Sequence, residues 1–266
     1  MTDEKTKRLA VKSACLEGRI QENASAQATD FNAWIFDHIP IKEGDTVLEL
    51  CCGTGAQTEF FLQRVGERGA VIALDISADS LEILKTRIRP EHNGRLTLIE
   101  SDIDMFNESL LKRKLSKKHF DIIFCSYGLY YSKNASQLLE QAKGWLKADG
   151  SLVIVGPFGP NNEPLFSLLC ECGVTISDYV RFTSQDFMQK DVIPFGIQNF
   201  KAISIKILKN TITWKSPESV LSYWKNTTFF EPDKSGYVQQ NLQDHFSKNG
   251  VFINEKWVML VIMNNE

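Results

Sequence analysis

"VLELCCGTGAQTEFF", residues 47–61, combines an apolar run, a glycine-containing turn and the start of a helical pattern. Continuous valine and leucine residues are typical of a strand that is buried on both faces of a sheet. Glycines let the backbone of a turn approach a ligand closely, and a helix that follows such a turn offers it free backbone N–H groups. The stretch therefore predicts a strand, a ligand-binding turn and a helix, in that order.

Further apolar runs alternate with helical stretches as far as residue 157. The runs are "AVIALD" (70–75), "RLTLIESD" (95–102), "FDIIFCS" (120–126) and "GSLVIVGP" (150–157). Strands that alternate with helices form an open parallel sheet, and right-handed crossovers place helices on both of its faces.

The last third of the chain adds two more strand-like runs. Residues 200–208, "FKAISIKIL", alternate like a strand with one wet face, and residues 256–263, "KWVMLVIM", resemble a buried strand. A polar, aromatic helical stretch at about 209–250 separates them. We therefore predict a doubly wound, Rossmann-like α/β fold with a seven-stranded sheet, mostly parallel with an antiparallel late strand.

The predicted domains are a helical N-terminal lid at 1–40 and a main domain at 41–266. The main domain is expected to hold a ligand-binding core at about 45–157 and a helical insertion at about 209–250 that covers a second substrate. The net charge of −3 and the sequence pI of about 5.9 give no electrostatic footprint for nucleic acid.

The chain contains no apolar run long enough for a signal peptide or a membrane span. Its six cysteines include no C-x-x-C pair, so no metal site is predicted. A reduced, cytoplasmic protein with buried thiols is the expectation.

Three ligand classes could use the glycine turn: a nucleoside triphosphate, a dinucleotide and S-adenosylmethionine. No Lys-Ser/Thr pair follows the turn, so it is not a P-loop. The dinucleotide fingerprint needs a third glycine three positions after Gly55, where this chain has Thr58.

Carboxylates in or after three predicted strands favour the third class. Asp75 ends the second strand, 20 residues after Gly55, where it could accept both hydrogens of a ribose diol. Asp102 ends the third strand and could accept from an adenine amino group, with Ile103 packed on the ring. Glu49 lies two residues before the cysteine pair, where its carboxylate could bind the α-amino group of the ligand. Such a lining suits an amine-bearing nucleoside and would repel a pyrophosphate.

The motifs "VLELCCGTG", "ALDIS", "ESDID", "FDIIFCSYGLYY" and "LKADGSLVIVGP" resemble, in the expected order, those of class I S-adenosylmethionine-dependent methyltransferases. The resemblance covers about residues 45–157 and is similar to the small-molecule branch that includes ubiquinone- and sterol-type enzymes. It implies methyl transfer to a small acceptor, with S-adenosylhomocysteine as the product. The residues predicted to bind the cofactor are Glu49, Cys51, Gly53, Gly55, Asp75, Ile76, Asp102, Ile103 and Cys125.

One position departs from the family pattern. The family usually has glycine where Cys51 stands. A side chain there must point away from the methionine part of the cofactor or narrow the pocket. We expect Cys51 and Cys52 to be small apolar fillers, with a redox or metal-sensing role as the alternative.

Candidates for catalysis and acceptor binding are fewer. Tyr130 and Tyr131 could face the sulfonium or orient an acceptor hydroxyl. Many ubiquinone-type relatives have histidine at the position of Tyr130, so this chain lacks that partner. His245 is the histidine that could reach the acceptor, although a surface helix would equally explain it. Trp34 and Trp224 could contact a hydrophobic or aromatic acceptor.

The chain has no Asn/Asp-Pro-Pro-Tyr/Phe motif after the fourth strand, which argues against methylation of nucleic-acid bases. The sequence is also compatible with two other functions. One is a catalytically inactive regulatory or partner protein that binds S-adenosylmethionine, and the other is an NAD-dependent oxidoreductase.

Overall fold

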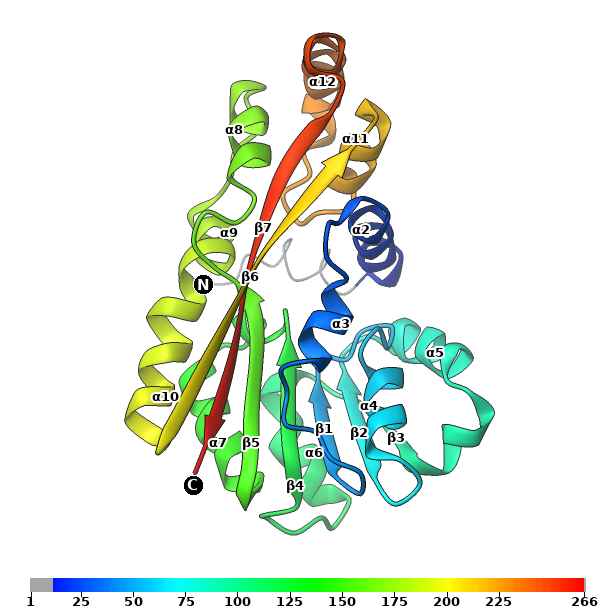
Figure 1. Cartoon of the computed structure of the whole chain (residues 1–266), viewed down its shortest axis with the longest axis vertical. Coiled ribbons are helices and arrows are strands. Elements are labelled where there is room, and N and C mark those ends of the chain that lie inside the picture. The colour runs from blue at the N-terminus through cyan, green and yellow to red at the C-terminus, as the bar shows by residue number, and fades with distance from the viewer. Residues whose placement is uncertain (1–11, 266) are drawn as a thin grey trace. The chain divides into compact units, whose positions relative to one another are not determined.

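A computed structural model describes residues 12–265 of the chain (Figure 1). Residues 1–11 of the predicted N-terminal lid lie outside this range. Contacts divide the chain into two compact units. Unit 1 comprises the described residues up to Phe31, Pro157–Asp186 and Ile207–Val258. Unit 2 comprises Asn32–Gly156, Phe187–Lys206 and the described residues from Met259 onward. The predicted division at residue 40 stays a prediction.

Seven strands form one mixed sheet in the order β3-β2-β1-β4-β5-β7-β6. The strands are β1 (Thr46–Leu50), β2 (Ala70–Asp75), β3 (Leu96–Glu100), β4 (Phe120–Ser126), β5 (Leu146–Pro157), β6 (Ala202–Trp214) and β7 (Phe252–Asn264). The pairs β3–β2, β2–β1, β1–β4 and β4–β5 are parallel. The arrow of β7 points opposite to that of β5 (Figure 1). The predicted fold class is confirmed.

The strand order reverses between β1 and β4. Chain connections leave β1 toward β2 on one side, whereas β4 lies on the other side of β1, with Leu50 in register with Cys125. An open α/β sheet binds its ligands outside the carboxyl ends of the strands at such a switch point. The glycine turn after β1 and the segment after β4 therefore lie where a sheet of this kind binds its ligand.

The late strands are longer than predicted. Strand β6 ends at Trp214 instead of residue 208, and β7 begins at Phe252 instead of residue 256. The reason is that alternation continues in β6, where Asn210 and Ile212 are buried and their neighbours are less so. Asn210, a polar residue at a buried position, hid the continuing strand period from the sequence.

Helices connect the strands of unit 2 and complete unit 1. Those wholly or partly in unit 2 are α3 (Phe31–Phe36), α4 (Thr58–Val65), α5 (Ala78–Arg87), α6 (Phe106–Lys112), α7 (Ala135–Trp145) and α10 (Ile193–Asn199). Those in unit 1 are α2 (Ser13–Ala26), α8 (Glu163–Glu171), α9 (Asp178–Arg181), α11 (Pro217–Lys225) and α12 (Ser235–Asn249). Short 3-10 turns precede β3 at Pro90–Arg95 and follow it at Ile103–Met105, and another follows β4 at Leu129–Tyr131.

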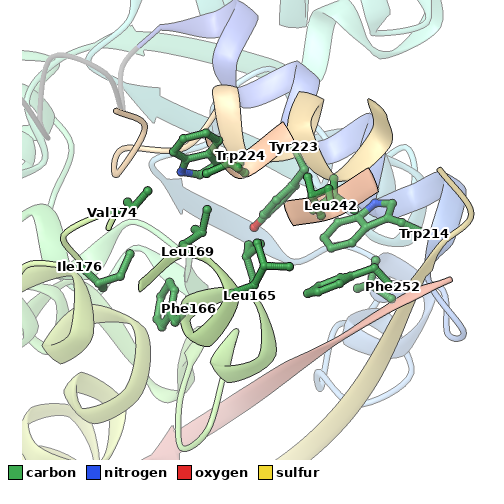
Figure 2. Close-up of a cluster of buried hydrophobic side chains, with 14 of the residues drawn as sticks. Leu165, Phe166, Leu169, Val174, Ile176, Trp214, Tyr223, Trp224, Leu242 and Phe252 are labelled. Carbon is green, nitrogen blue, oxygen red and sulfur yellow. The ribbon is translucent and has the colours of Figure 1, made fainter. Parts of the chain in front are cut away.

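Each unit has its own core. In unit 2, Phe61 of α4 packs edge-on against Phe124 of β4, with ring centroids 5.0 Å apart. In unit 1, side chains of α8, α11, α12 and the ends of β6 and β7 form an aromatic cluster (Figure 2). Trp214 and Trp224 are both fully buried in it.

Helix α2 packs on α11 within unit 1. Arg19 donates to the carbonyl of Asn226 at 2.5 Å, and the indole of Trp214 donates to the carbonyl of Glu22 at 3.3 Å. Gln27 makes an antiparallel bridge with Ile212 of β6. The described part of the N-terminal segment up to Phe31 is therefore integral to unit 1.

Candidate functional site

The turn after β1 has the backbone geometry that its glycines allow. Gly53 and Gly55 have φ values of 53° and 85°, in the left-handed region that favours glycine. A Cβ at Gly55 would also lie 2.6 Å from Cγ of Leu84 in α5. The N–H of Cys52 donates to the carbonyl of Leu74 at 3.0 Å, which ties the turn to β2. The turn is thus held close to the end of the neighbouring strand.

Glu49 places a buried carboxyl group at this turn. It is 1% exposed, and one oxygen accepts a hydrogen bond from the Thr58 hydroxyl at 2.6 Å. The other oxygen, Oε1, has no partner among the described residues. Burial raises the pKa of Glu49 to about 8, with a further increase from the nearby charge of Asp75, while the Thr58 hydrogen bond opposes it. A ligand ammonium group would match this unpaired oxygen.

Asp75, the last residue of β2, is hydrogen-bonded by the turn. Its Oδ2 accepts from the N–H of Gly53 at 2.8 Å, and its Oδ1 accepts from the N–H of Ser77 at 2.9 Å. Burial raises the pKa of Asp75, and these backbone hydrogen bonds oppose the increase. Each oxygen keeps a second acceptor position, so a half-buried carboxylate of this kind can still accept from a diol.

Asp102 lies at the same edge of the sheet, because the N–H of Ser101 donates to the carbonyl of Asp75 at 2.9 Å. The Asp102 side chain caps the following turn by accepting from the N–H of Asp104 at 2.9 Å. Ile103 is buried, whereas Ile76 is 49% exposed. An exposed isoleucine one residue after the diol-binding candidate is a suitable surface for a flat base.

Cys51 points toward the segment after β4. Its φ is 57°, and its thiol interacts with the buried thiol of Cys125. A Cβ at Gly128 would lie 2.4 Å from Cβ of Cys51 and 2.6 Å from its sulfur. The neighbouring Cys125 thiol, together with burial, raises the pKa of the Cys51 thiol. Cys51 therefore fills a space that the glycine at position 128 leaves.

The two tyrosines after β4 pack with each other and with unit 2. The rings of Tyr130 and Tyr131 are edge-on with centroids 4.7 Å apart, and Tyr130 is edge-on to Phe187 at 5.9 Å. Trp34 of α3 is half-buried beside His38, with ring centroids 5.1 Å apart.

The remaining two candidates lie in unit 1. Trp224 is fully buried, and its indole donates to the carbonyl of Phe229 at 3.3 Å. It lies in the aromatic core of unit 1, and its contact with an acceptor stays a prediction. His245 is hydrogen-bonded through Nε2 to the carbonyl of Val251 at 3.1 Å, just beyond the end of α12. This contact fits the alternative that His245 is a helix residue with a local role.

Several residues that hold the turn were not predicted from the sequence. Gln57 donates to Asn32 at 2.8 Å, and Asn32 donates to the carbonyl of Ala56 at 3.3 Å. Arg87 of α5 donates to the carbonyl and the hydroxyl of Thr54 at 3.2 and 3.1 Å. Only the polar character of Gln57 and Asn32 could have hinted at these contacts, since they join residues far apart in sequence.

The site combines a buried carboxyl group with an unpaired oxygen, a second carboxylate at the tip of β2 and an exposed apolar side chain beside it. This donor and acceptor set can bind an amine, a diol and a base. Among residues 12–265 there is no cluster of three or more His, Cys, Asp or Glu side chains that could hold a metal ion. None of the helices in that range is both long enough and apolar enough to span a bilayer.

The glycine turn and the strands beside it belong to a stretch that matches a known family model. Residues 47–150 match the model described as "Methyltransferase domain". A demethylmenaquinone methyltransferase of Lactobacillus johnsonii is 30% identical over 140 residues, which cover 52% of this chain and 54% of that protein. A 2-phytyl-1,4-naphtoquinone methyltransferase of Trichormus variabilis is 30% identical over 122 residues, which cover 46% of this chain and 51% of that protein. The chain thus spans about half the length of the curated relatives it matches.

The fold is also found among solved structures. The YcgJ protein of Bacillus subtilis superposes with a TM-score of 0.59 over 88% of this chain and 98% of that protein, at 12% sequence identity. Agreement at this level of identity concerns the fold.

Proposed function

We propose that this chain, whose residues 47–150 match the family model described as "Methyltransferase domain", is a class I enzyme that transfers a methyl group from S-adenosylmethionine to a small aromatic acceptor. The observation that carries the proposal is the Glu49 carboxyl group, which is 1% exposed and has an oxygen without a partner in the described part of the chain. An unpaired buried carboxyl oxygen costs about 1–3 kcal/mol unless a ligand satisfies it. The α-ammonium group of the methyl donor would do so.

Each side chain of the site has a role in this proposal. Glu49 binds the ammonium group, Asp75 accepts from the ribose diol and Asp102 accepts from the adenine amino group. Ile76 and Ile103 pack against the base. The glycines of the turn let the backbone approach the methionine part.

S-adenosylmethionine supplies a methyl group on a positively charged sulfur, and the transfer breaks the S–CH₃ bond, leaves its electron pair on sulfur and forms the acceptor–CH₃ bond. The protein then needs to align donor and acceptor, which contributes up to roughly 7–11 kcal/mol in favourable cases. It must also keep water away from the reacting atoms. Tyr130 and Tyr131 are the proposed aromatic wall for the sulfonium, since an aromatic face stabilises a cation.

The proposed acceptor is a quinol or a related aromatic hydroxyl compound. Two relatives at 30% identity are named as methyltransferases of demethylmenaquinone and of a phytylated naphthoquinone. Because each match covers only about half of the relative, the acceptor class is part of the proposal. No residue is assigned as a general base. None is needed if the acceptor hydroxyl is already ionised and the carbon next to it attacks the methyl group.

The cofactor assignment is tested by calorimetric titration with S-adenosylhomocysteine. Asp75→Ala should weaken binding at least tenfold, about 1.4 kcal/mol, because charge-assisted hydrogen bonds are lost. Asp79→Ala is the matched control, since this exposed carboxylate lies four residues later on α5. Equal affinity of the wild type and a folded Asp75→Ala variant would refute the assigned role.

Turnover and a competing cofactor separate this proposal from its rivals. Incubation with radiolabelled S-adenosylmethionine and 1,4-dihydroxynaphthalene in oxygen-free buffer should yield labelled product. Binding of S-adenosylhomocysteine without turnover on a panel of phenols, quinols and amines would favour a non-catalytic partner protein. Tight binding of NADH with no response to S-adenosylhomocysteine would favour an oxidoreductase.

A further inference from the structure

We propose that a cluster of polar side chains in unit 1 binds a hydroxyl group of a small aromatic ligand. The cluster, called the unit 1 polar cluster below, consists of Asn162, Tyr223, Asn254 and Lys256. The inference goes beyond the proposed function and does not depend on which compound accepts the methyl group. The site itself is built only from residues of unit 1.

Lys256 brings a positive charge to the cluster that no carboxylate neutralises. Its Nζ donates to Asn162 Oδ1 at 2.6 Å and to the Tyr223 hydroxyl, and it lies 4.5 Å from the centroid of the Tyr223 ring. Within residues 12–265, no carboxylate forms an ion pair with Lys256.

The neighbouring helix adds to this positive potential. Asn162 is the residue before α8, so the ammonium group lies at the positive end of the helix dipole. A cation at that end is unfavourable by roughly 0.3–1 kcal/mol. The Lys256 charge and the positive end of α8 both favour a ligand oxygen in the cluster, and both disfavour a ligand ammonium group.

One buried polar atom of the cluster has no partner among the described residues, and one hydroxyl hydrogen has no acceptor there. Asn254 is fully buried and donates through Nδ2 to Asn162 Oδ1 at 2.9 Å, but its Oδ1 has no partner among the described residues. The amide orientations are determined, because Lys256 can only donate and so identifies the Asn162 atom as oxygen. Tyr223 is 4% exposed; its oxygen accepts from Lys256, and no acceptor for its O–H hydrogen is found in the described range.

The unpaired atoms specify the chemistry of the ligand. The cluster offers one acceptor, Asn254 Oδ1, together with donors from Tyr223 and Lys256. A carboxylate or phosphate would satisfy the donors but not the acceptor, and an ammonium group would do the reverse beside a lysine. A hydroxyl group can donate its hydrogen to Asn254 Oδ1, and its oxygen can accept from Tyr223 and Lys256. It therefore satisfies all three groups.

The surroundings fit an aromatic hydroxyl compound. Tyr223 lies beside Trp214 with ring centroids 5.1 Å apart, and its hydroxyl end is directed toward α8 (Figure 2). Asn162 follows β5 by five residues and donates its N–H to the carbonyl of Glu255 at 2.9 Å. This backbone hydrogen bond holds Asn162 next to Asn254 and Lys256 of β7.

The test compares two probes that differ only in their hydroxyl groups, 1,4-dihydroxynaphthalene and 1,4-dimethoxynaphthalene. Calorimetry in oxygen-free buffer with saturating S-adenosylhomocysteine measures the affinity of each. The wild type should bind the diol at least tenfold more tightly than the ether. Lys256→Met keeps the length of the side chain and should abolish most of this preference, whereas Lys256→Arg should retain part of it.

Lys209→Met is the matched control. Lys209 lies on the neighbouring strand β6 and forms an exposed ion pair with Glu255 at 2.7 Å, outside the cluster. This variant should bind both probes like the wild type. If Lys256→Met fails to fold, Tyr223→Phe removes only the hydroxyl and should weaken diol binding at least fivefold.

An unchanged preference for the diol in folded Lys256→Met and Tyr223→Phe would overturn the inference, and so would a wild type that binds both probes equally. The cluster would then be a structural network around an ordered water. Failure of the wild type to bind S-adenosylhomocysteine would instead overturn the proposed function, and the diol preference can still be measured without that compound.

Discussion

Cys51 occupies a backbone conformation that normally belongs to glycine. With a φ of 57°, a residue bearing a Cβ is strained by roughly 1–2 kcal/mol. The side chain is accommodated because position 128, on the segment after β4, has no Cβ of its own. Cys51 and Gly128 therefore form a coupled pair that joins the cofactor turn to the segment that carries Tyr130 and Tyr131.

A double-mutant cycle tests this coupling. Gly128→Ala should weaken S-adenosylhomocysteine binding more than tenfold or destabilise the fold by about 2 kcal/mol, because its methyl group would lie 2.4 Å from Cβ of Cys51. Cys51→Gly should be neutral or stabilising by itself. Combined with Gly128→Ala it should restore binding, since the remaining neighbour, Cys125 Sγ, is 3.2 Å away. Additive effects would mean that the two residues are independent.

Glu49 predicts a pH-dependent affinity for the cofactor. Burial raises its pKa to about 8 in the free protein, and the ammonium group of the ligand would lower it in the complex. Between these two pKa values binding releases a proton, so affinity should rise with pH, by up to about tenfold per unit, and level off above about 8. The groups that face this carboxyl are the Thr58 hydroxyl, the Asp75 carboxylate and the Cys52 thiol.

The measurement is calorimetry with S-adenosylhomocysteine between pH 5.5 and 7.5, in buffers of different ionisation enthalpy, which also counts the released protons. Glu49→Gln should bind more weakly and lose most of the slope. Any slope that remains in this variant belongs to Asp75, whose pKa burial also raises. A wild-type affinity that does not change over this range would contradict the proposed contact.

At the scale of elements, α5 supports the turn from the side of β2. Ser77 caps the helix by accepting from the N–H of Ser80 at 3.2 Å, and Leu84 fills the space beside Gly55. Arg87, in the last turn of α5, reaches back to Thr54. A helix that contacts its ligand-binding turn through both packing and hydrogen bonds restricts the conformations of that turn.

We therefore expect Arg87→Met to weaken S-adenosylhomocysteine binding about three- to tenfold while changing the free energy of unfolding by less than about 1 kcal/mol. The control is Lys85→Met, since the Lys85–Glu82 pair is exposed and contributes little. Calorimetry and urea unfolding of both variants provide the comparison. Equal affinities in the two variants would show that Arg87 does not order the turn.

At the scale of the whole molecule, the two cores predict separable effects of core mutations. Phe166 of α8 is fully buried in unit 1, and Phe61 of α4 is fully buried in unit 2 beneath the turn. Each change to alanine should lower the free energy of unfolding by about 3–5 kcal/mol. The two variants should differ in cofactor binding.

Phe166→Ala should keep the wild-type affinity for S-adenosylhomocysteine at temperatures where it is folded. Phe61→Ala should weaken that affinity, because α4 carries Thr58, the hydrogen-bond donor to Glu49. Thermal unfolding followed by titration at 10 °C below each midpoint makes the comparison. If Phe166→Ala lowers the affinity for S-adenosylhomocysteine, then cofactor binding depends in part on the packing of unit 1.

The sequence by itself determined the strand order along the chain, the parallel sheet and the glycine turn, because these depend on local periodicity and on the conformational freedom of glycine. It also predicted cofactor-binding roles for Glu49, Asp75 and Asp102 from their places at or near strand ends, and these roles stay predictions. The continuation of β6 to Trp214 was not predicted from the sequence, because the polar residue Asn210 stands at a buried position and obscures the strand period.

Only the tertiary structure decided which polar atoms have partners. The unpaired oxygen of Glu49, the fit of Cys51 against Gly128 and the burial of Trp224 each depend on contacts that have no sequence signature. The unit 1 polar cluster joins Asn162 to Lys256 across 94 positions of the chain. Such contacts arise from packing, which brings together residues that sequence spacing leaves unrelated.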